Sequence, residues 1–403
     1  MVAKINADTS GGLKITSDTS GTLEIQSAGT TKFTVNSAGV AMPGPLTGLT
    51  SINGGQVGGS RNKIINGAME INQRGTAAVA TDQAFPSDRF KTGEAGGGNM
   101  TCQVVADAPA GFRNSIKAIA STADDCSQAA DEYTIQHRIE GNNVVDLYYG
   151  NSGAKTTTLS FWVKSSLTGN FACFLVNAAQ NRSLVKQYNI AQADTWEKKS
   201  VTFVGDEAGT WLITNGIGLN LCFTLGAGTN YAGTIDSWQG SRLMRGSSSV
   251  QFMATVNATW FVTGIQLEVG STATDFEYRS NGQELALCRR YFRKFGGIAG
   301  QPLSQQGAQY LDGNTIYFSY MADLSEMRAA PTASLTGTVN TDYAVYQSGF
   351  TKQAGFAIGA VAYSSKVGVL FQTVKNGHGL SSIPQLFLGA GSTSGFLQLS
   401  AEL

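Results

Sequence analysis

The chain is short of charge, of histidine and of long apolar runs. Only 14% of its 403 residues are charged, against about 25% in an average domain, and 28 basic residues balance 28 acidic ones. This balance gives no net field that would favour nucleic acid or an anionic membrane as a partner. No apolar run approaches the ~20 residues of a membrane-spanning helix, and residues 1–10 have no apolar signal core. We expect a soluble protein made in a cytoplasm without a signal peptide.

Cysteine and histidine are too few and too scattered for a disulfide framework, a metal site or a catalytic triad. The five cysteines are odd in number and show no Cys-x-x-Cys or Cys/His ligand spacing. Of the two histidines, His137 falls on the apolar face of an expected strand, and His378 lies in a Gly-rich turn. Without a recognisable third partner, a Ser-His-Asp system is unsupported. We expect His137 to be a core residue, and we predict no metal ion and no cofactor.

Acidic pairs are the remaining catalytic candidates, because polysaccharide cleavage uses two carboxylates. The densest pairs are Asp124-Asp125 and Asp131-Glu132, and Asp206-Glu207 in a turn is a weak candidate for calcium. Neighbours in sequence are not automatically a spatial pair, and acidic loop residues are usually solvated. We therefore expect solvated turns here and no enzymatic activity.

Glycine is abundant, with 49 residues, and Ser, Thr and Asn fill much of the remainder. This mixture is typical of short strands joined by tight turns and suits long helices poorly. Between 85 and 280, short alternating runs separated by turn residues predict an antiparallel, jelly-roll-like β-sandwich. The best expected strands are 100–106, 133–140, 157–164, 171–177, 196–204, 217–225 and 258–268.

Residues 1–40 contain a repeat of ten residues, in which LKITS returns as LEIQS and again as FTVNS. Each copy offers two apolar side chains two positions apart, the period of a half-buried strand. So few side chains cannot bury themselves, and such a repeat needs cover from its neighbours. We expect an assembly or attachment segment covered by another copy of the chain or by another protein. Its interface positions are Leu13, Ile15, Leu23, Ile25, Phe33 and Val35.

Composition divides the rest of the chain. Residues 41–84 contain a Gly- and Pro-rich linker that leads into the sandwich.

At 281–297, Asn-Gly-Gln-Glu has the chemistry of a capping box, and we expect one connecting helix. Its apolar stripe is Leu285, Cys288, Phe292 and Phe295. Residues 298–403 return to strand patterns, with an expected hairpin of 357–363 and 367–373 and a closing strand at 396–403. The expected fold class is all-β: a short β-repeat segment, a β-sandwich, one short helix and a C-terminal β-rich domain.

Two groups of strings resemble the tail-fibre modules of tailed bacteriophages. One opens the sandwich, with NKIINGAM at 62–69, INQRG at 71–75 and SDRF at 87–90. The other closes it, with TGIQLEVG at 263–270, TDFEYRS at 274–280 and LALCRRYF at 285–292. The resemblance covers roughly residues 8–40 and 62–295. It implies a virion structural protein, commonly a homotrimer, with a sandwich similar to carbohydrate-binding modules and a role in adsorption to the host.

A long Gly- and Ser-rich stretch, 226–249, interrupts the regular patterns, and loops this long in compact domains are often functional. Sugars present apolar C–H faces and hydroxyls, so their sites need an aromatic platform beside hydrogen-bonding side chains. We predict ligand contacts by Tyr231, Asp236, Trp238 and Arg242. In the alternative, the two aromatic rings fold back onto the sandwich core. A second candidate, from its place near the chain end, is the group Tyr310, Tyr343 and Tyr346.

The resulting expectation is a non-enzymatic tail fibre of the virion. Its N-terminus would attach to other phage tail proteins, and its sandwich or C-terminal domain would bind a glycan or protein of the host surface. We expect a trimer, no nucleic acid and no membrane insertion. One alternative is a structural or decoration protein of the baseplate, tail tip or head without a receptor. The other is a polysaccharide-cleaving tailspike, with a carboxylate pair in a groove.

Overall fold

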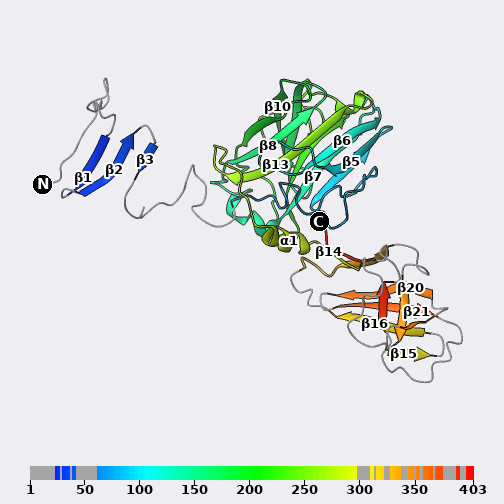
Figure 1. Cartoon of the computed structure of the whole chain (residues 1–403). Helices are drawn as coiled ribbons and strands as arrows, with labels where there is room; N and C mark the ends of the chain where they lie inside the picture. The colour runs from blue at the N-terminus through cyan, green and yellow to red at the C-terminus, as the bar shows by residue number, and fades with distance from the viewer. Residues whose placement is uncertain are drawn as a thin grey trace. The chain divides into compact units, whose positions relative to one another are not determined.

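Figure 1 shows the computed structural model of the chain. It describes residues 61–296 without a gap. The other described stretches are 23–27, 30–36, 39–41, 309–312, 315–321, 327–336, 343–347, 351–353, 357–365, 368–374, 387–390 and 396–403. The chain divides into two compact units, Met1–Ile52 and Asn53–Leu403.

In the first unit, three short strands form an antiparallel sheet: β1 (Leu23–Ser27), β2 (Thr30–Asn36) and β3 (Gly39–Ala41). Leu23 pairs with Val35, and Ile25 pairs with Phe33. The apolar positions of two successive repeats therefore lie opposite each other on one face of the sheet. The predicted strands are confirmed for these two repeats. Outside the described residues lie the interface positions of the first repeat, Leu13 and Ile15.

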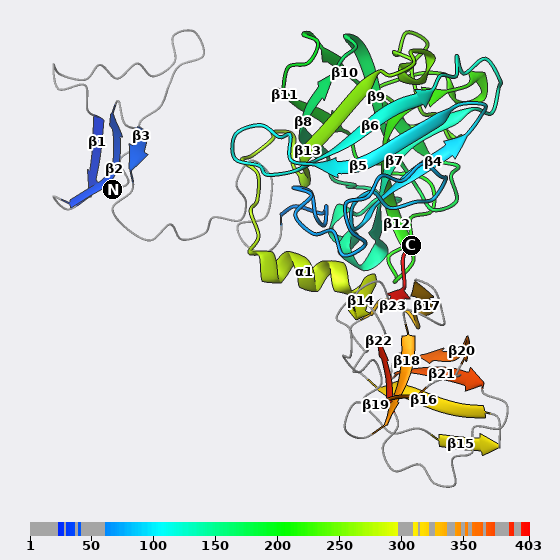
Figure 2. The ribbon, with the colours of Figure 1, turned by 45° about the vertical axis from the view of Figure 1, so that its right-hand side comes forward.

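The predicted antiparallel β-sandwich is present, with two five-stranded sheets that face each other (Figures 1 and 2). We name each sheet after its central strand. The β12 sheet has the order β10 (Ser183–Ile190), β9 (Gly169–Val176), β12 (Ile217–Ala227), β7 (Glu132–Glu140) and β4 (Phe90–Ala95). The β13 sheet has the order β11 (Glu197–Phe203), β8 (Thr157–Ser165), β13 (Thr259–Val269), β6 (Ser115–Thr122) and β5 (Asn99–Val105).

Each strand that we expected in the sandwich is present, with ends that differ by at most two residues. The sequence analysis missed β4, β6 and β10. The sequence of β4, FKTGEA, has a central glycine and two charges in place of an alternating pattern. Its first four residues are nevertheless buried, because β4 pairs with the well-patterned strand β7. Tertiary pairing, and not local propensity, makes this segment a strand.

The core lies between the sheets, and the β12 sheet is also covered on its outer face. Along β9, Phe171 and Cys173 belong to the core between the sheets, whereas Ala172 and Phe174 belong to a separate buried cluster. A strand buried on both faces appears in sequence as a continuous apolar run. All five cysteines are buried free thiols, and burial raises the pKa of the Cys126 thiol to about 12.

The predicted helix is present but shorter. Helix α1 spans Asn281–Arg289, and its N-cap is Ser280, which forms a capping box with Gln283 one residue before the predicted one. The expectation of a helix through 295 is wrong, because Phe292–Gly296 forms strand β14. This strand pairs with β23 (Phe396–Ser400), so a partner far along the chain supplies the hydrogen bonds that a longer helix would have made within itself.

The described strands after α1 form three small sheets. The first has the order β14, β23 and β17 (Thr332–Thr336). The second has the order β15 (Gln309–Asp312), β16 (Thr315–Met321), β21 (Gly368–Val374) and β20 (Ala357–Ser365). The third has the order β19 (Thr351–Gln353), β18 (Tyr343–Gln347) and β22 (Phe387–Ala390). The predicted hairpin is present as β20 and β21, and the predicted closing strand as β23. Within the described part of the chain, no helix is long and apolar enough to cross a membrane.

The strings that resemble tail-fibre modules meet in the structure. The side chain of Asn62 accepts the N–H of Leu267 at 3.1 Å and donates to the carbonyl of Ile265 at 3.1 Å. The opening string thus lies against the closing one on β13. Further along, Arg74 and Arg89 both bind the carboxylate of Glu402. These strings form the junction of the sandwich, α1 and the last strand.

Candidate functional site

Two loops meet where β7 ends and β12 begins. The first contains the 3₁₀ helices η1 (Gly141–Asn143) and η2 (Val145–Leu147), and the second covers 205–216. Gly141 donates its N–H to the Gly216 carbonyl at 2.9 Å, and Asn142 donates to the Thr214 carbonyl at 2.9 Å. A Cβ on Gly218 would lie 2.5 Å from the Cα of Gly141. Glycine at these positions therefore lets the two loops approach to backbone contact.

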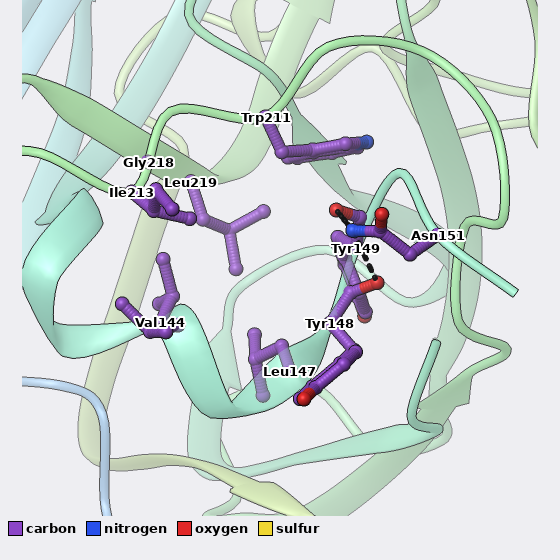
Figure 3. A pocket seen from close by; sticks show the side chains of 10 residues that line it. Val144, Leu147, Tyr148, Tyr149, Asn151, Trp211, Ile213, Gly218 and Leu219 are labelled. Carbon is purple, nitrogen blue, oxygen red and sulfur yellow. Dashed lines mark hydrogen bonds between the residues drawn. The ribbon is translucent and has the colours of Figure 1, made fainter. Parts of the chain in front are cut away.

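The two loops enclose a half-open cavity of about 240 Å³ (Figure 3). Val144, Leu147 and Leu219 are buried and line its apolar interior. Trp211 lies on one side of the cavity and Tyr148 on the opposite side, as Figure 3 shows. The cavity therefore offers an apolar interior between two aromatic side chains.

Tyr148 is held in an uncommon backbone conformation. It caps η2 with φ +60° and ψ 21°, in the left-handed region, which costs a non-glycine residue roughly 1–2 kcal/mol. Its side chain is 58% exposed. Asn151 follows three residues later, and its Nδ2 donates to the Tyr149 carbonyl at 3.3 Å. Strain of this kind occurs at binding sites, where the fold holds a side chain in position for a ligand.

Trp211 is fixed by two hydrogen bonds, one of them to a buried carboxylate. Its Nε1 donates to Asp206 Oδ2 at 3.1 Å and to the Ala208 carbonyl at 3.2 Å. Asp206 is 2% exposed and pairs with Arg182, whose Nε lies 2.9 Å from Oδ2. Our expectation of a solvated turn at Asp206 is therefore wrong, because this carboxylate orients the tryptophan.

A second cavity, of about 430 Å³, adjoins the first and shares Val145 and Tyr148 with it. It is more polar than the first: the exposed residues Asn142 and Asn143 line it, and so does Lys63, whose Nζ lies 2.8 Å from Asp146. We call the two cavities together the Tyr148 groove. The groove combines the exposed Tyr148 and the half-buried Trp211 with amide donors and acceptors, and its charged residues are Lys63, Asp146 and Arg279.

This combination suits the recognition of sugars better than chemistry. Aromatic faces contact the apolar C–H faces of a sugar ring, while amides donate to and accept from hydroxyls. Among the described residues that line the groove, Asp146 is the sole carboxylate. The two-carboxylate arrangement of glycoside hydrolysis is therefore not present among these residues.

The structure separates the four ligand residues that we predicted in 226–249. Trp238 packs against the sandwich core, with its ring centroid 5.3 Å from that of Trp211 and its Nε1 donating to the Val204 carbonyl at 2.9 Å. Asp236 is exposed and pairs with Lys186 at 2.8 Å. Trp238 and Tyr231 therefore pack against two different buried clusters.

Tyr231 and Arg242 lie together over the outer face of the β12 sheet. Tyr231 packs on the cluster that contains Phe174, and the Arg242 guanidinium lies 5.6 Å from the Tyr231 ring centroid. Arg242 also hydrogen-bonds Glu132 Oε2 at 2.7 Å, which anchors the loop to β7. The rings of Tyr231 and Trp238 thus fold onto the sandwich, as in the alternative, while a ligand role for the four residues stays a prediction.

The sequence analysis missed Tyr148, Trp211 and the amides of Asn142 and Asn143. One signal was available: the pairs Leu212-Ile213 and Tyr148-Tyr149 are large and apolar, yet they lie in segments rich in Gly, Asn and Thr. No sequence spacing indicates that these two segments meet, because the pairing of β7 with β12 brings them together.

The residues that we weighed for catalysis have structural partners. His137 is 1% exposed, as expected of a core histidine, and Ile65 donates its N–H to Nε2 at 3.2 Å. Asp124 accepts the Tyr133 hydroxyl at 2.6 Å. Burial alone would raise the pKa of Asp124, but this bond and the N–H donors of its loop outweigh burial and lower it. His378 lies outside the described residues.

No protein-family model and no curated protein sequence matches the chain. Similar solved structures include a family 4 carbohydrate-binding module, at 14% identity and TM-score 0.28, covering 52% of this chain and 99% of the module. A family 11 carbohydrate-binding module from Clostridium thermocellum, solved with a β-1,3-1,4-mixed-linked tetrasaccharide, has 10% identity and TM-score 0.27, with 50% and 99% covered.

The enzymatically active domain of tailspike protein 4 from bacteriophage CBA120 is also similar, at 10% identity and TM-score 0.28. The match covers 52% of this chain but 21% of that domain, so the chain corresponds to a small part of the tailspike domain. At these identities the likeness concerns the fold alone. The fold itself is the antiparallel β-sandwich described above.

Proposed function

We propose that the chain is a non-enzymatic, glycan-binding tail fibre of a bacteriophage virion. The observation that carries glycan binding is the Tyr148 groove, in which a strained, exposed tyrosine and a fixed tryptophan flank an apolar cavity beside the exposed amides of Asn142 and Asn143. Fixed aromatic side chains lose little conformational entropy when a ligand binds, which favours affinity.

The tail-fibre part of the proposal has separate support. The strings at 62–90 and 263–292 resemble tail-fibre modules, and in the structure they form one junction. The N-terminal sheet places the apolar positions of two repeats on one face, which suits attachment to a tail or to further copies of the chain. The proposed protein is a trimer of the virion tail that binds the host surface.

A second candidate function has an observation of its own. Val145, Leu212 and Ile213 are 45%, 39% and 59% exposed around the groove, and clustered apolar exposure also marks protein contacts. A virion structural protein without a receptor would use this surface between subunits. In that case, replacing Ile213 with Ser would change the oligomeric mass of the chain, and neither the original chain nor the variant would bind sugars.

The test of glycan binding is an array of bacterial lipopolysaccharides, capsular polysaccharides and neutral glucans, probed with the full chain. We expect binding that Tyr148→Gly lowers about tenfold, because one lost aromatic contact of ~1.4 kcal/mol corresponds to that factor. Glycine tolerates the left-handed conformation, so the melting temperature should not fall. Tyr148→Phe should retain binding.

Two control variants locate the site. Trp196 directly precedes β11, and its Nε1 donates to Asp107. Because Trp196 does not line the Tyr148 groove, Trp196→Ala should leave binding unchanged. Tyr231→Ala tests the loop 226–249 directly. Binding that survives Tyr148→Gly but is lost in Tyr231→Ala would move the site to that loop and overturn the groove assignment.

A further inference from the structure

A third cavity, of about 310 Å³, continues the Tyr148 groove. It shares Arg279 with the second cavity. The segment 62–70 lines both cavities, with Lys63 and Ile65 at the second and Ala68 and Glu70 at the third. Helix α1 lines both as well, so the two cavities have two walls in common.

The third cavity has its own exposed and fixed aromatic residue. Tyr278 is 63% exposed, the largest exposed fraction among the large apolar side chains of the described residues. Its hydroxyl donates to the Gly111 carbonyl at 3.0 Å. Its ring centroid lies 4.9 Å from that of Phe276 and 5.7 Å from that of Phe112. Tyr278 thus resembles Tyr148 in being an exposed tyrosine at the rim of a cavity, and its ring is in addition held in place by these contacts.

Arg279 joins the two cavities and is itself immobilised. Its Nη1 donates to the Ile64 carbonyl at 3.0 Å, and its Nη2 donates to the Asn62 carbonyl. It also lies 3.5 Å from Glu284. A residue bound on several sides cannot swing away as a gate, so it forms a permanent part of the surface between the two cavities.

The charges along this path cancel. The positively charged residues that line the three cavities are Lys63, Arg113 and Arg279, and the negatively charged ones are Asp146, Glu70 and Glu284. Three positive and three negative groups leave no net charge. An uncharged chain of sugars fits this surface, whereas a polyanionic chain would meet as much repulsion as attraction.

We propose that the three cavities are subsites of one track, which binds an extended neutral polysaccharide from Trp211, past Tyr148 and Arg279, to Tyr278. This inference rests on the proposed glycan binding and adds its length and its charge class. It assigns Tyr278 as a specificity residue that contacts only ligands long enough to reach the third cavity.

The test uses a size ladder from one to eight repeating units, prepared by partial hydrolysis of the neutral polysaccharide that binds best on the array. Affinity of the full chain should rise at least tenfold along the ladder. Tyr278→Ala should lower affinity for the longest fragments about tenfold and leave the shortest unchanged, while Tyr148→Gly lowers both. Tyr278 is exposed, so the variant should fold, and its melting temperature checks this.

Three results would overturn the track. Equal affinity for short and long fragments would leave glycan binding intact but confine it to the first cavity. A change of oligomeric mass in Tyr278→Ala without a loss of affinity would assign the third cavity to a contact between copies of the chain. If charged polysaccharides alone bind, and 0.5 M salt abolishes their binding, the neutral charge class is wrong. If nothing on the array binds, the proposed function itself fails.

Discussion

At the scale of single residues, several of the scarce charges of the sandwich are buried in hydrogen bonds within the fold instead of facing solvent. Arg290 and Tyr291 both hydrogen-bond the carboxylate of Glu140, which is 1% exposed. Burial would raise the pKa of Glu140, but these hydrogen bonds outweigh burial and lower it. A buried carboxylate is tolerated only with such partners. The Arg290–Glu140 pair therefore connects the C-terminal end of α1 to the end of β7.

His137 shows how a buried titratable group couples stability to pH. Burial, with a contribution from Arg89, holds its pKa well below the ordinary value of 6.5. The unfolded chain takes up a proton as the pH falls through about 6.5, whereas the folded chain does not. Proton uptake by the unfolded state then favours unfolding.

We predict that this histidine destabilises the fold by up to about 1.4 kcal/mol per pH unit below pH 6.5. Replacing His137 with Asn removes the titration, so the difference in unfolding free energy between the two proteins should change between pH 7.5 and pH 5.5. Urea unfolding at both pH values measures it. The carboxyl groups are common to both proteins and cancel in the difference. A constant difference would contradict a neutral buried His137.

At the scale of elements, close contacts between loops build the site. The loop after β7 and the loop before β12 touch through backbone atoms at Gly141 and Gly218. A Cβ on Gly218 would also lie 2.6 Å from Val144 Cγ2, and Val144 lines the first cavity. The shape of the groove therefore depends on a residue without a side chain.

We predict that Gly218→Ala destabilises the chain by about 1–3 kcal/mol, because the added methyl group forces the two loops apart. Sugar binding should weaken with it. Gly240→Ala is the matched control, since a Cβ there meets no atom within 4 Å, and it should change stability by less than ~0.5 kcal/mol. Thermal unfolding of both variants measures this difference in stability. Equal melting temperatures would contradict the close contact between Gly218 and Gly141.

At the scale of the whole molecule, the N-terminal sheet is too small to be stable without a partner. Three strands of three to seven residues with one apolar face make too little core for independent stability. Trimerisation and attachment to a tail would both cover that face. Of the two, self-association is the one that purified protein can reveal.

We predict that replacing Leu23 and Ile25 with Ser converts a trimer into monomers while the sandwich stays folded. The control replaces Glu24 and Gln26 with Ser, because these polar residues alternate in the sequence with the apolar positions of β1. Analytical ultracentrifugation gives the mass. A trimer in both variants would place the subunit contacts elsewhere in the chain and leave the repeats to be covered by the tail.

The sequence by itself determined the class of fold and the regularly patterned strands, because the alternation of apolar and polar residues is a local property that survives any arrangement of the strands. It did not determine β4, β6 and β10. It also located the helix start, since a capping box needs only residues three apart. It did not determine where the helix ends, which depends on the pairing of β14 with β23, about a hundred residues further along the chain.

The tertiary structure alone decided the site. Lys63, Asp146, Trp211 and Arg279 come from four separate segments, and the pairing of strands and the packing of α1 bring them to one groove. It also decided that Tyr231 and Arg242 cover the β12 sheet, because an ion pair with Glu132 across 110 residues holds them there. A local pattern does not contain such long-range contacts, and it therefore predicted the scaffold but not the Tyr148 groove.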